Sequence, residues 1–273
     1  MDVLGYANKR VLVTGCFSGM GYATAKLLLD LGAEVHGLDY KACELPLASF
    51  QLCDMRVCEQ IDTAVDTVGA GGRIDAVFSC AGLPQTAPAI DVMRVNYAGT
   101  RRVAERAMAY MSEGGAVASI SSTGGLGWSQ NMPKLMELIA AGDYSQSISW
   151  CEQNLDSVKE GYSFSKEAII AWTMLTASHS IKNGIRINCT LPSPTQTPMM
   201  KDFLEASGKD VIDAATQPSG RYSTPEQQAQ GLVYLNSDLA SFVNGVFLPV
   251  DGGFIGGVMT GQVDLSVMMQ RKA

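Results

Sequence analysis

The pattern that decides the fold lies in residues 10–39, which read RVLVTGCFSGMGYATAKLLLDLGAEVHGLD. The apolar, β-branched residues 10–13 predict a buried strand, and the glycine-containing turn 14–21 follows directly. Apolar residues at helical spacing then lead to Gly32, which predicts the end of a helix, and residues 34–38 predict a second strand. A strand, a glycine turn, a helix and a strand in this order form a βαβ unit.

Three glycines in this turn, Gly15, Gly19 and Gly21, predict a dinucleotide phosphate site. Without side chains they let backbone N–H groups approach a pyrophosphate at the helix N-terminus, where the helix dipole favours anions. Asp39 ends the second strand 18 residues after Gly21, close to the spacing expected for a carboxylate that binds a ribose 2′-OH. This carboxylate would repel a 2′-phosphate, so we expect NAD rather than NADP. Lys41 lies close enough in sequence to weaken that preference, and an ordinary tight turn is the alternative for the glycines alone.

The alternation of strand and helix patterns continues along the chain. Further strands are predicted at 50–53, 74–79 and 116–120, and helices at 61–68 and 93–111. The fold class is therefore α/β: a single-domain, Rossmann-type, doubly wound parallel sheet over residues 1–273, with helices on both faces. Ligands of such sheets bind beyond the carboxyl ends of the strands.

Composition and charge narrow the possible functions. The 273 residues are 47% hydrophobic and 17% charged, as in a soluble globular enzyme, and the net charge of −7 argues against a nucleic-acid groove. The apolar runs are too short for a membrane span, and the N-terminus lacks an apolar signal core. Seven cysteines without Cys-x-x-Cys spacing indicate reduced thiols in a cytoplasm. Only His36 and His179 are histidines, so we expect no metal site and no Ser-His-Asp triad.

Residues 161–172, GYSFSKEAIIAW, place Tyr162 four positions before Lys166 at the start of a predicted helix. Positions i and i+4 share a helix face, so the phenol and the ammonium can point into the same space. A nearby cation lowers a tyrosine pKa, ordinarily about 10, which predicts a tuned general acid/base. Taken alone, such a pair is more often an ordinary surface helix start.

Together with further motifs, these residues resemble the classical short-chain dehydrogenases/reductases over nearly the whole chain. The matches, in order, are Thr14-Gly15-x-x-x-Gly19-x-Gly21, Cys80-Ala81-Gly82, Asn96, Ser122, Tyr162, Lys166, Ile185-Arg186-Ile187-Asn188, Leu191-Pro192-Ser193-Pro194, Thr197 and Val250-Asp251-Gly252-Gly253. Cys80 departs from the family's Asn-Ala-Gly motif, and Ser193 replaces the usual glycine. The resemblance implies hydride transfer between NAD and an alcohol or carbonyl.

Site roles follow from this resemblance. Tyr162 is implied to be the general acid/base, Lys166 to lower its pKa and bind the nicotinamide ribose, and Ser122 to hydrogen-bond the substrate oxygen. Asn96 is implied to hold a water that links Lys166 to solvent. Read singly, Ser122 would cap a turn, Asn96 would satisfy buried backbone groups, and Asp54 would be a solvated loop acid rather than an adenine ligand. The implied cofactor contacts are Gly15, Phe17, Ser18, Gly19, Met20, Asp39, Asp54, Met55, Cys80, Ala81, Gly82, Tyr162, Lys166, Pro192, Thr195 and Thr197.

Two segments are expected to control the substrate. Ser122 and Tyr162 are 40 positions apart, a longer gap than in most relatives. The extra segment, 128–160, has helical patterns at 134–141 and 147–158, and it resembles the branch of 3α-hydroxysteroid dehydrogenase/carbonyl reductases and coniferyl alcohol dehydrogenases. Because its ends lie near the catalytic residues, we expect it to shape access to the active site; packing on the domain or on a subunit is the alternative. Residues 198–220 are expected to form a substrate lid.

The predicted function is that of an NAD-dependent dehydrogenase for a hydrophobic steroid, terpenoid or aryl alcohol. The residues expected to form pocket walls are Leu83, Pro84, Trp128 and Trp150. We expect a cytoplasmic homodimer or homotetramer with a small-molecule substrate, and neither nucleic acid nor membrane as a partner. The alternatives are an NADPH-dependent carbonyl reductase of the same fold and a non-catalytic dinucleotide-sensing protein.

Overall fold

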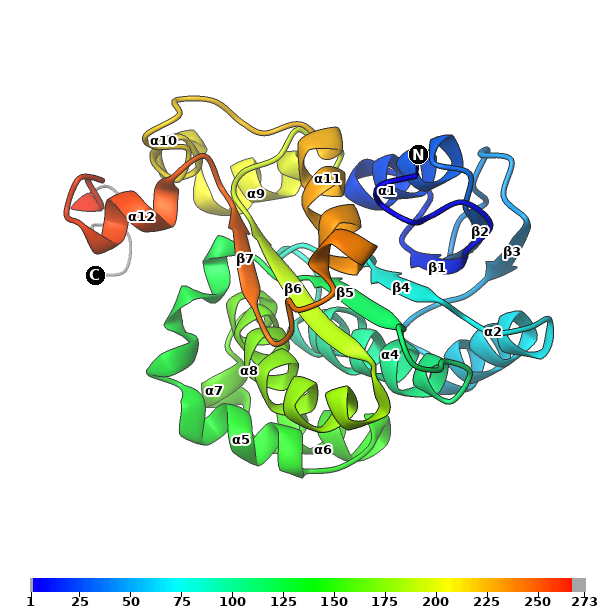
Figure 1. The fold of residues 1–273 in the computed structure, drawn as a ribbon. Helices are drawn as coiled ribbons and strands as arrows, with labels where there is room; N and C mark the ends of the chain where they lie inside the picture. Colours follow the sequence, from blue (N-terminus) through cyan, green and yellow to red (C-terminus); the bar gives the residue numbers. More distant parts are fainter. Residues whose placement is uncertain (1, 267–273) are drawn as a thin grey trace.

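A parallel sheet forms the centre of the computed structural model, which describes residues 2–266 (Figure 1). Within these residues seven strands follow the order β3-β2-β1-β4-β5-β6-β7, and every neighbouring pair is parallel. The strands are β1 (Arg10–Thr14), β2 (Glu34–Asp39), β3 (Ser49–Leu52), β4 (Ala76–Ser79), β5 (Ala116–Ile120), β6 (Arg186–Pro192) and β7 (Phe247–Val250). The predicted Rossmann-type sheet is thus confirmed. Residues 1 and 267–273 of the predicted domain lie outside the described residues.

Helices cover both faces of the sheet, as the alternation predicted. Leu12 of β1 packs into a core shared with α2, α4 and α8, whereas Val11 and Val13 pack on the opposite side, with α1 and α11. Successive strand residues face opposite sides, so a wholly apolar strand can serve both cores. These helices are α1 (Gly19–Asp30), α2 (Cys58–Ala70), α4 (Thr100–Met108), α8 (Tyr162–Ser180) and α11 (Pro225–Asn236).

The segment between Ser122 and Tyr162 is helical and lies on the outside of α8, drawn in green (Figure 1). It contains the 3-10 helix η2 (Thr123–Ser129), α5 (Met132–Ala140), α6 (Tyr144–Gln153) and α7 (Leu155–Val158). The second helix predicted here was placed too late, at 147. The Asp143 carboxylate accepts a hydrogen bond from the Gln146 backbone N–H, and the Gln146 side chain accepts one from the Asp143 N–H. This capping box starts α6 at Tyr144.

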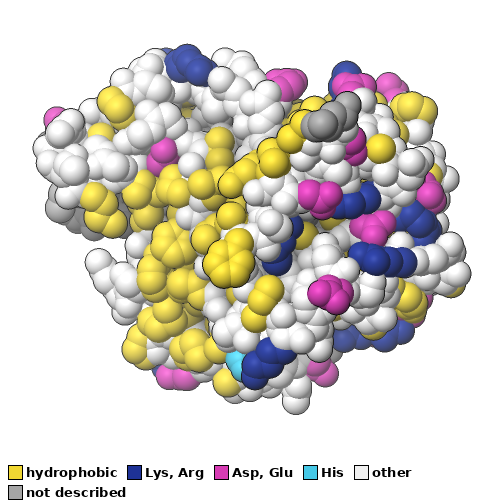
Figure 2. All heavy atoms as spheres, in the orientation of Figure 1, with side chains coloured by type: hydrophobic (Ala, Val, Ile, Leu, Met, Phe, Trp, Pro, Cys, Tyr) yellow, Lys and Arg dark blue, Asp and Glu magenta, His cyan; other side chains and the backbone are white. Residues whose placement is uncertain are grey.

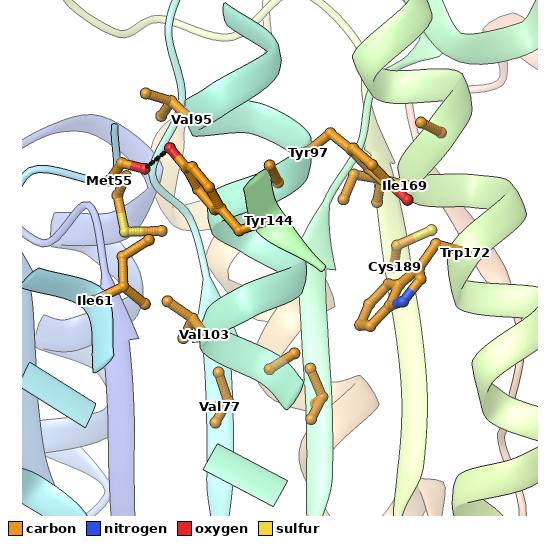
Figure 3. Close-up of a cluster of buried hydrophobic side chains, with 14 of the residues drawn as sticks. Met55, Ile61, Val77, Val95, Tyr97, Val103, Tyr144, Ile169, Trp172 and Cys189 are labelled. Carbon is orange, nitrogen blue, oxygen red and sulfur yellow. Dashed lines mark hydrogen bonds between the residues drawn. The ribbon is translucent and has the colours of Figure 1, made fainter. Parts of the chain in front are cut away.

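The inserted helices belong to the main hydrophobic core. Leu135 and Leu138 of α5 are fully buried in the core that also contains α4 and α8. Figure 3 shows Tyr144 of α6 among buried side chains, with its hydroxyl donating to the Met55 carbonyl oxygen at 3.1 Å. The insert therefore stabilises the domain that it interrupts.

The remaining helices stand at the carboxyl end of the sheet or between strands. α9 (Met200–Ser207) and α10 (Lys209–Ala214) follow β6, within the segment predicted to be a lid. α12 (Phe254–Met259) follows β7, and α3 (Ala89–Val92) leads into a π-helical turn, η1 (Met93–Gly99). No helix in residues 2–266 is both long enough and apolar enough to cross a lipid bilayer.

Candidate active site

The turn between β1 and α1 leaves its backbone uncovered by side chains. Gly15 has a φ of +73°, and a Cβ atom there would lie 2.6 Å from the backbone nitrogen of Ala81. A Cβ atom at Gly21 would lie 2.1 Å from the carbonyl oxygen of Gly15. In the part of the chain that the structure describes, Ser18 at the N-cap makes no side-chain hydrogen bond to the helix. The first N–H groups of α1 therefore remain available to an anion, and the turn fits the pyrophosphate of a dinucleotide.

Asp39 is fixed beside this turn at the end of β2. It is only 7% exposed, and its carboxylate accepts from the backbone N–H of Phe17 at 2.9 Å and of Lys41 at 3.0 Å. The ammonium of Lys41 lies over the rings of Phe17 (5.2 Å) and Tyr40 (5.1 Å). The carboxylate predicted to bind a ribose is thus in place, with one cation close to it.

A second loop is joined to the first through the hydroxyl of Thr14. This oxygen accepts from the backbone N–H groups of Cys80 at 3.1 Å and Ala81 at 3.2 Å. Burial raises the pKa of the Cys80 thiol to about 12, so the residue that replaces the family's asparagine is neutral. Cys80, Gly82 and Met20 line a cavity that is also lined by Ser122, Tyr162 and Lys166.

The predicted adenine end of the site follows β3. The Asp54 carboxylate pairs with the Arg56 guanidinium at 2.6 Å, and this hydrogen bond lowers the pKa of Asp54. The backbone of the next residue, Met55, is held by Tyr144 from the insert. Asp54 is therefore an ionised acceptor paired with Arg56, and its contact with an adenine stays a prediction.

Tyr162, Lys166 and Ser122 meet in one place although β5 and α8 supply them separately. The Lys166 ammonium lies 5.6 Å from the centroid of the Tyr162 ring, and the Ser122 side chain is close enough to Tyr162 to lower its pKa. The Ser122 hydroxyl also accepts from the Gly124 N–H at 3.0 Å, so it caps η2 as the simpler interpretation predicted. All three residues line the cavity.

The electrostatics of this pair differ from the sequence prediction. Burial raises the pKa of Tyr162, and the hydrogen bond from Ser122 opposes that rise only in part. Burial also lowers the pKa of Lys166 to about 8, and its ammonium donates to the Ile120 carbonyl oxygen at 2.9 Å. Burial therefore gives Tyr162 a raised pKa in the chain by itself, and the lowering by Lys166 that the resemblance implies stays a prediction.

Asn96 lies in the π-helical turn η1 and is 1% exposed. Its side-chain oxygen accepts from the Leu83 N–H at 2.7 Å, and its amide nitrogen donates to the Leu83 carbonyl at 3.1 Å and to Ser165 at 3.3 Å. The amide thus satisfies buried polar groups, the simpler of the two interpretations. It also holds Leu83 at the cavity wall, while the water relay stays a prediction.

The loop after β6 closes the site from the other side. Thr195 donates to the Ser193 carbonyl at 2.8 Å and lies 2.9 Å from the Ser223 hydroxyl. The Thr197 methyl lies 3.3 Å from where a Cβ atom on Gly19 would stand. Pro192, Thr195 and Thr197 line the cavity, as expected of nicotinamide contacts.

A cavity of about 770 Å³ contains these groups and continues into an apolar region. The apolar lining residues are Leu83, Leu126, Met199, Met200, Phe203, Val211, Ile212, Ala215, Phe254, Val258 and Leu265. Phe203 of α9 packs edge-on against the Tyr162 ring, with centroids 5.1 Å apart and an angle of 72°. Gln85, Gln130 and Ser207 add polar atoms. A ring-bearing substrate with few polar groups fits such a wall.

Three of the residues predicted to form pocket walls are placed elsewhere. Among the residues that the structure describes, Pro84, Trp128 and Trp150 do not line the cavity. Trp128 packs edge-on against Phe247 at 5.5 Å, and Trp150 stacks on Phe164 at 6.0 Å. Large apolar side chains on the insert are buried against the nearest part of the core, which takes them away from the substrate.

Comparisons with known proteins agree with this geometry. Residues 9–134 match the family model described as short chain dehydrogenase, and residues 147–255 match one described as enoyl-(acyl carrier protein) reductase. The chain is 30% identical over 247 residues to a coniferyl-alcohol dehydrogenase from Pseudomonas sp. strain HR199, covering 90% of this chain and 96% of that one. The chain belongs to the short-chain dehydrogenase/reductase family.

Two further relatives of this short-chain dehydrogenase support the branch that the resemblance predicted. One is the 3-alpha-hydroxysteroid dehydrogenase/carbonyl reductase of Comamonas testosteroni, 27% identical over 250 residues that cover 89% of this chain and 95% of that one. The other is the structure of a 3-alpha-hydroxysteroid dehydrogenase from Pseudomonas sp. B-0831 complexed with NADH. It is 27% identical with a TM-score of 0.77, covering 94% of this chain and all of that one. The protein is thus an oxidoreductase of the alcohol dehydrogenase type.

The insert, 128–160, spans the gap between the two family-model matches. Residues 135–146 fall between the two stretches that the family models match, and they comprise most of α5, the turn after it and the start of α6. The described residues of the insert that line the cavity lie at its beginning, at Gln130, whereas α5, α6 and α7 pack on the core.

For several residues of this short-chain dehydrogenase, the sequence did not predict the contribution that they make to the site. Thr14 was noted only as part of the glycine motif, although its hydroxyl joins two cofactor loops. Phe203 was covered only by the predicted lid, 198–220, and its contact with Tyr162 was not foreseen. Glu167 carried no signal, because a carboxylate next to a lysine on a helix is usually exposed.

Proposed function

We propose that this short-chain dehydrogenase interconverts a hydrophobic cyclic or aryl alcohol and its ketone or aldehyde, with NAD as the cofactor. The observation that carries this proposal is that Ser122, Tyr162 and Lys166 meet in a cavity that is otherwise lined mainly by apolar side chains. The acid/base groups and the hydrophobic wall thus face the same substrate. The names of the relatives, which refer to an aryl alcohol and to hydroxysteroids, support the same substrate class.

The catalytic roles follow from the positions of the three side chains. In alcohol oxidation Tyr162 takes the hydroxyl proton, while Ser122, which lies beside Tyr162, holds the substrate oxygen on which charge develops. Lys166 binds the nicotinamide ribose, and its cation favours the ionised form of Tyr162. The bound nicotinamide supplies the hydride acceptor or donor. Phe203 packs edge-on against the Tyr162 ring and places apolar surface beside the reacting groups.

NAD is the proposed cofactor because Asp39 presents a carboxylate where a ribose 2′-OH would bind. Two backbone N–H groups fix this carboxylate, so it cannot turn away from a 2′-phosphate without losing both hydrogen bonds. One observation favours the alternative of an NADPH-dependent reductase, namely the Lys41 ammonium held between Phe17 and Tyr40 beside the same site. Titration of both cofactors distinguishes the two.

The charge of the cavity argues against phosphorylated or CoA-linked substrates. Among the described residues that line it, Lys166 is the only cation, and the proposed mechanism uses it for the nicotinamide ribose. A substrate phosphate would therefore find no further cationic side chain among these lining residues.

A homo-oligomer is proposed from the surface of the last strand. Figure 2 shows hydrophobic side chains gathered where β7 lies in Figure 1. β7 is an edge strand of the described sheet; Phe247 and Leu248 are half-buried in it, and Phe242 just before it is exposed. A second copy of this chain would cover these groups.

The seven cysteines are all free, which supports the proposed cytoplasmic location.

The function is tested by following reduced nicotinamide while the purified protein is offered NAD and a panel of alcohols. Hydroxysteroids, cinnamyl-type aryl alcohols and cyclohexanols are expected to be oxidised, and short open-chain polyols to be poor substrates. Tyr162→Phe is the control that must lose this activity. Oxidation of the polyols alone, or activity that survives in Tyr162→Phe, would contradict the proposal.

A further inference from the structure

The 3-10 helix η2, which begins after Ser122, lies directly on the backbone of α8. A Cβ atom on Gly125 would stand 3.0 Å from the carbonyl carbon of Lys166. A Cβ atom on Gly127 would stand 2.4 Å from the Oε1 atom of Glu167. Side chains at these two glycines would push the segment away from the helix that carries the catalytic tyrosine.

Glu167 is buried beneath this segment. It is 5% exposed, and its Oε2 atom accepts from the side-chain amide of Asn131 at 2.7 Å. A buried carboxylate is costly unless it is hydrogen-bonded, so the contact with Asn131 stabilises Glu167 in this position. The mechanism above makes no use of it.

Two successive residues of α8 thus hold both ends of the same segment. At the near end the Ser121 hydroxyl donates to the Lys166 carbonyl oxygen at 2.7 Å. At the far end Glu167 binds Asn131, the residue before α5. Between these anchors lie Ser122 and the cavity-lining residues Leu126 and Gln130.

We propose that Glu167 is a positioning residue, which holds the segment from Ser122 to Asn131 on α8 and so keeps the Ser122 hydroxyl against Tyr162. This inference rests on the proposed dehydrogenase function. The cofactor site is held independently, because Asp39 is fixed by Phe17 and Lys41. Loss of the Glu167 anchor is therefore expected to reduce turnover and to leave NAD affinity in place.

The test compares Glu167→Ala, Glu167→Gln and Asn131→Ala. Small displacements of a catalytic group can cost up to about 100-fold in rate, so we expect kcat to fall about 10- to 100-fold in the two alanine variants, with the Kd for NAD within about twofold. Glu167→Gln retains an oxygen that can accept from Asn131, and it is expected to keep most of the activity. The loss in the double variant Glu167→Ala/Asn131→Ala should be smaller than the product of the two single losses, since both single variants remove the contact between these side chains. Glu137→Ala, which removes an exposed carboxylate paired with Lys134 on α5, is the matched control and should be unaffected.

The pH dependence of alcohol oxidation distinguishes a loss of Ser122 positioning from the mere loss of the Glu167 charge. The Ser122 hydrogen bond lowers the Tyr162 pKa, so its loss in Glu167→Ala should move the midpoint for alcohol oxidation to higher pH. Removal of a nearby negative charge alone would move it to lower pH. A midpoint that moves down, wild-type kcat in Glu167→Ala, or equal losses of NAD affinity and turnover would overturn the proposal.

Two further measurements test the role of Glu167 if Glu167→Ala does not fold or if wild type is inactive. If Glu167→Ala fails to fold, Gly127→Ala perturbs the same contact while retaining the carboxylate, and an unchanged kcat there would count against the anchor. If wild type oxidises no alcohol in the panel, the proposed function fails. The positioning role is then read from the absorbance titration of Tyr162, taken as the difference between each variant and its Tyr162→Phe counterpart. A Tyr162 pKa that Glu167→Ala leaves unchanged refutes the role.

Discussion

Replacing Lys166 with methionine is expected to stabilise the unliganded protein while removing its activity. Lys166 is 4% exposed, its ammonium donates to the Ile120 carbonyl oxygen, and burial lowers its pKa from 10.5 to about 8. A buried cation without an ionic partner opposes folding. Methionine fills a similar volume and carries no charge.

The size of the effect follows from the two pKa values. Below pH 8 both the folded and the unfolded chain hold the proton, and the full cost of burying the ammonium, about 3 kcal/mol, is subtracted from the free energy of unfolding. Between pH 8 and 10.5 the folded chain releases the proton first, so this cost falls as pH rises and is absent above 10.5. The lost hydrogen bond to Ile120 offsets about 1 kcal/mol. Lys166→Met should therefore be more stable by about 2 kcal/mol at neutral pH, which is about 4–8 °C in Tm.

Thermal unfolding of the cofactor-free proteins, followed by circular dichroism near pH 7 and again near pH 9.5, provides the measurement. About 1 kcal/mol of the cost remains at the higher pH, which the lost hydrogen bond cancels, so the two Tm values should converge. Lys26→Met is the matched control, because Lys26 is exposed on α1 and paired with Asp30. A Lys166→Met variant that is less stable than wild type near pH 7, or a difference that does not shrink at higher pH, would refute the reasoning.

Three other predictions concern function and assembly. Tyr162→Phe should lower kcat by about 10²–10⁴-fold and leave NAD binding by calorimetry nearly unchanged; retention of more than about a tenth of the activity would contradict the acid/base role. Asp39→Asn should narrow the ratio of NAD to NADP affinity, since it removes the charge that faces a 2′-phosphate, and competitive titration of the two cofactors reads that ratio. The protein should be a dimer or tetramer by light scattering at micromolar concentration, and Phe242→Asp should weaken it; a monomeric wild type would exclude the interface at β7.

The order of the elements, and the meeting of Ser122, Tyr162 and Lys166 in one cavity, could be predicted from the sequence. The turn 14–21 and the acid at the end of the second strand are local signals, because glycine conformation and helix polarity act over a few residues. Once the sheet is known to be parallel, its strands end at one edge, so Thr14, Asp39 and Ser122 are brought together without further information.

The chemistry of those residues was decided by tertiary structure. Whether Tyr162 has a raised or a lowered pKa depends on how deeply α8 is buried and on the carbonyl oxygen that Lys166 reaches, and neither is visible in a four-residue spacing. Trp128 and Trp150 were assigned to the pocket by their type, but their neighbours Phe247 and Phe164 come from β7 and α8. Burial and pairing depend on residues distant in the sequence. The sequence alone therefore determined the order of the elements and which polar residues follow the strands, and only the folded chain determined their charge, their partners and the walls around them.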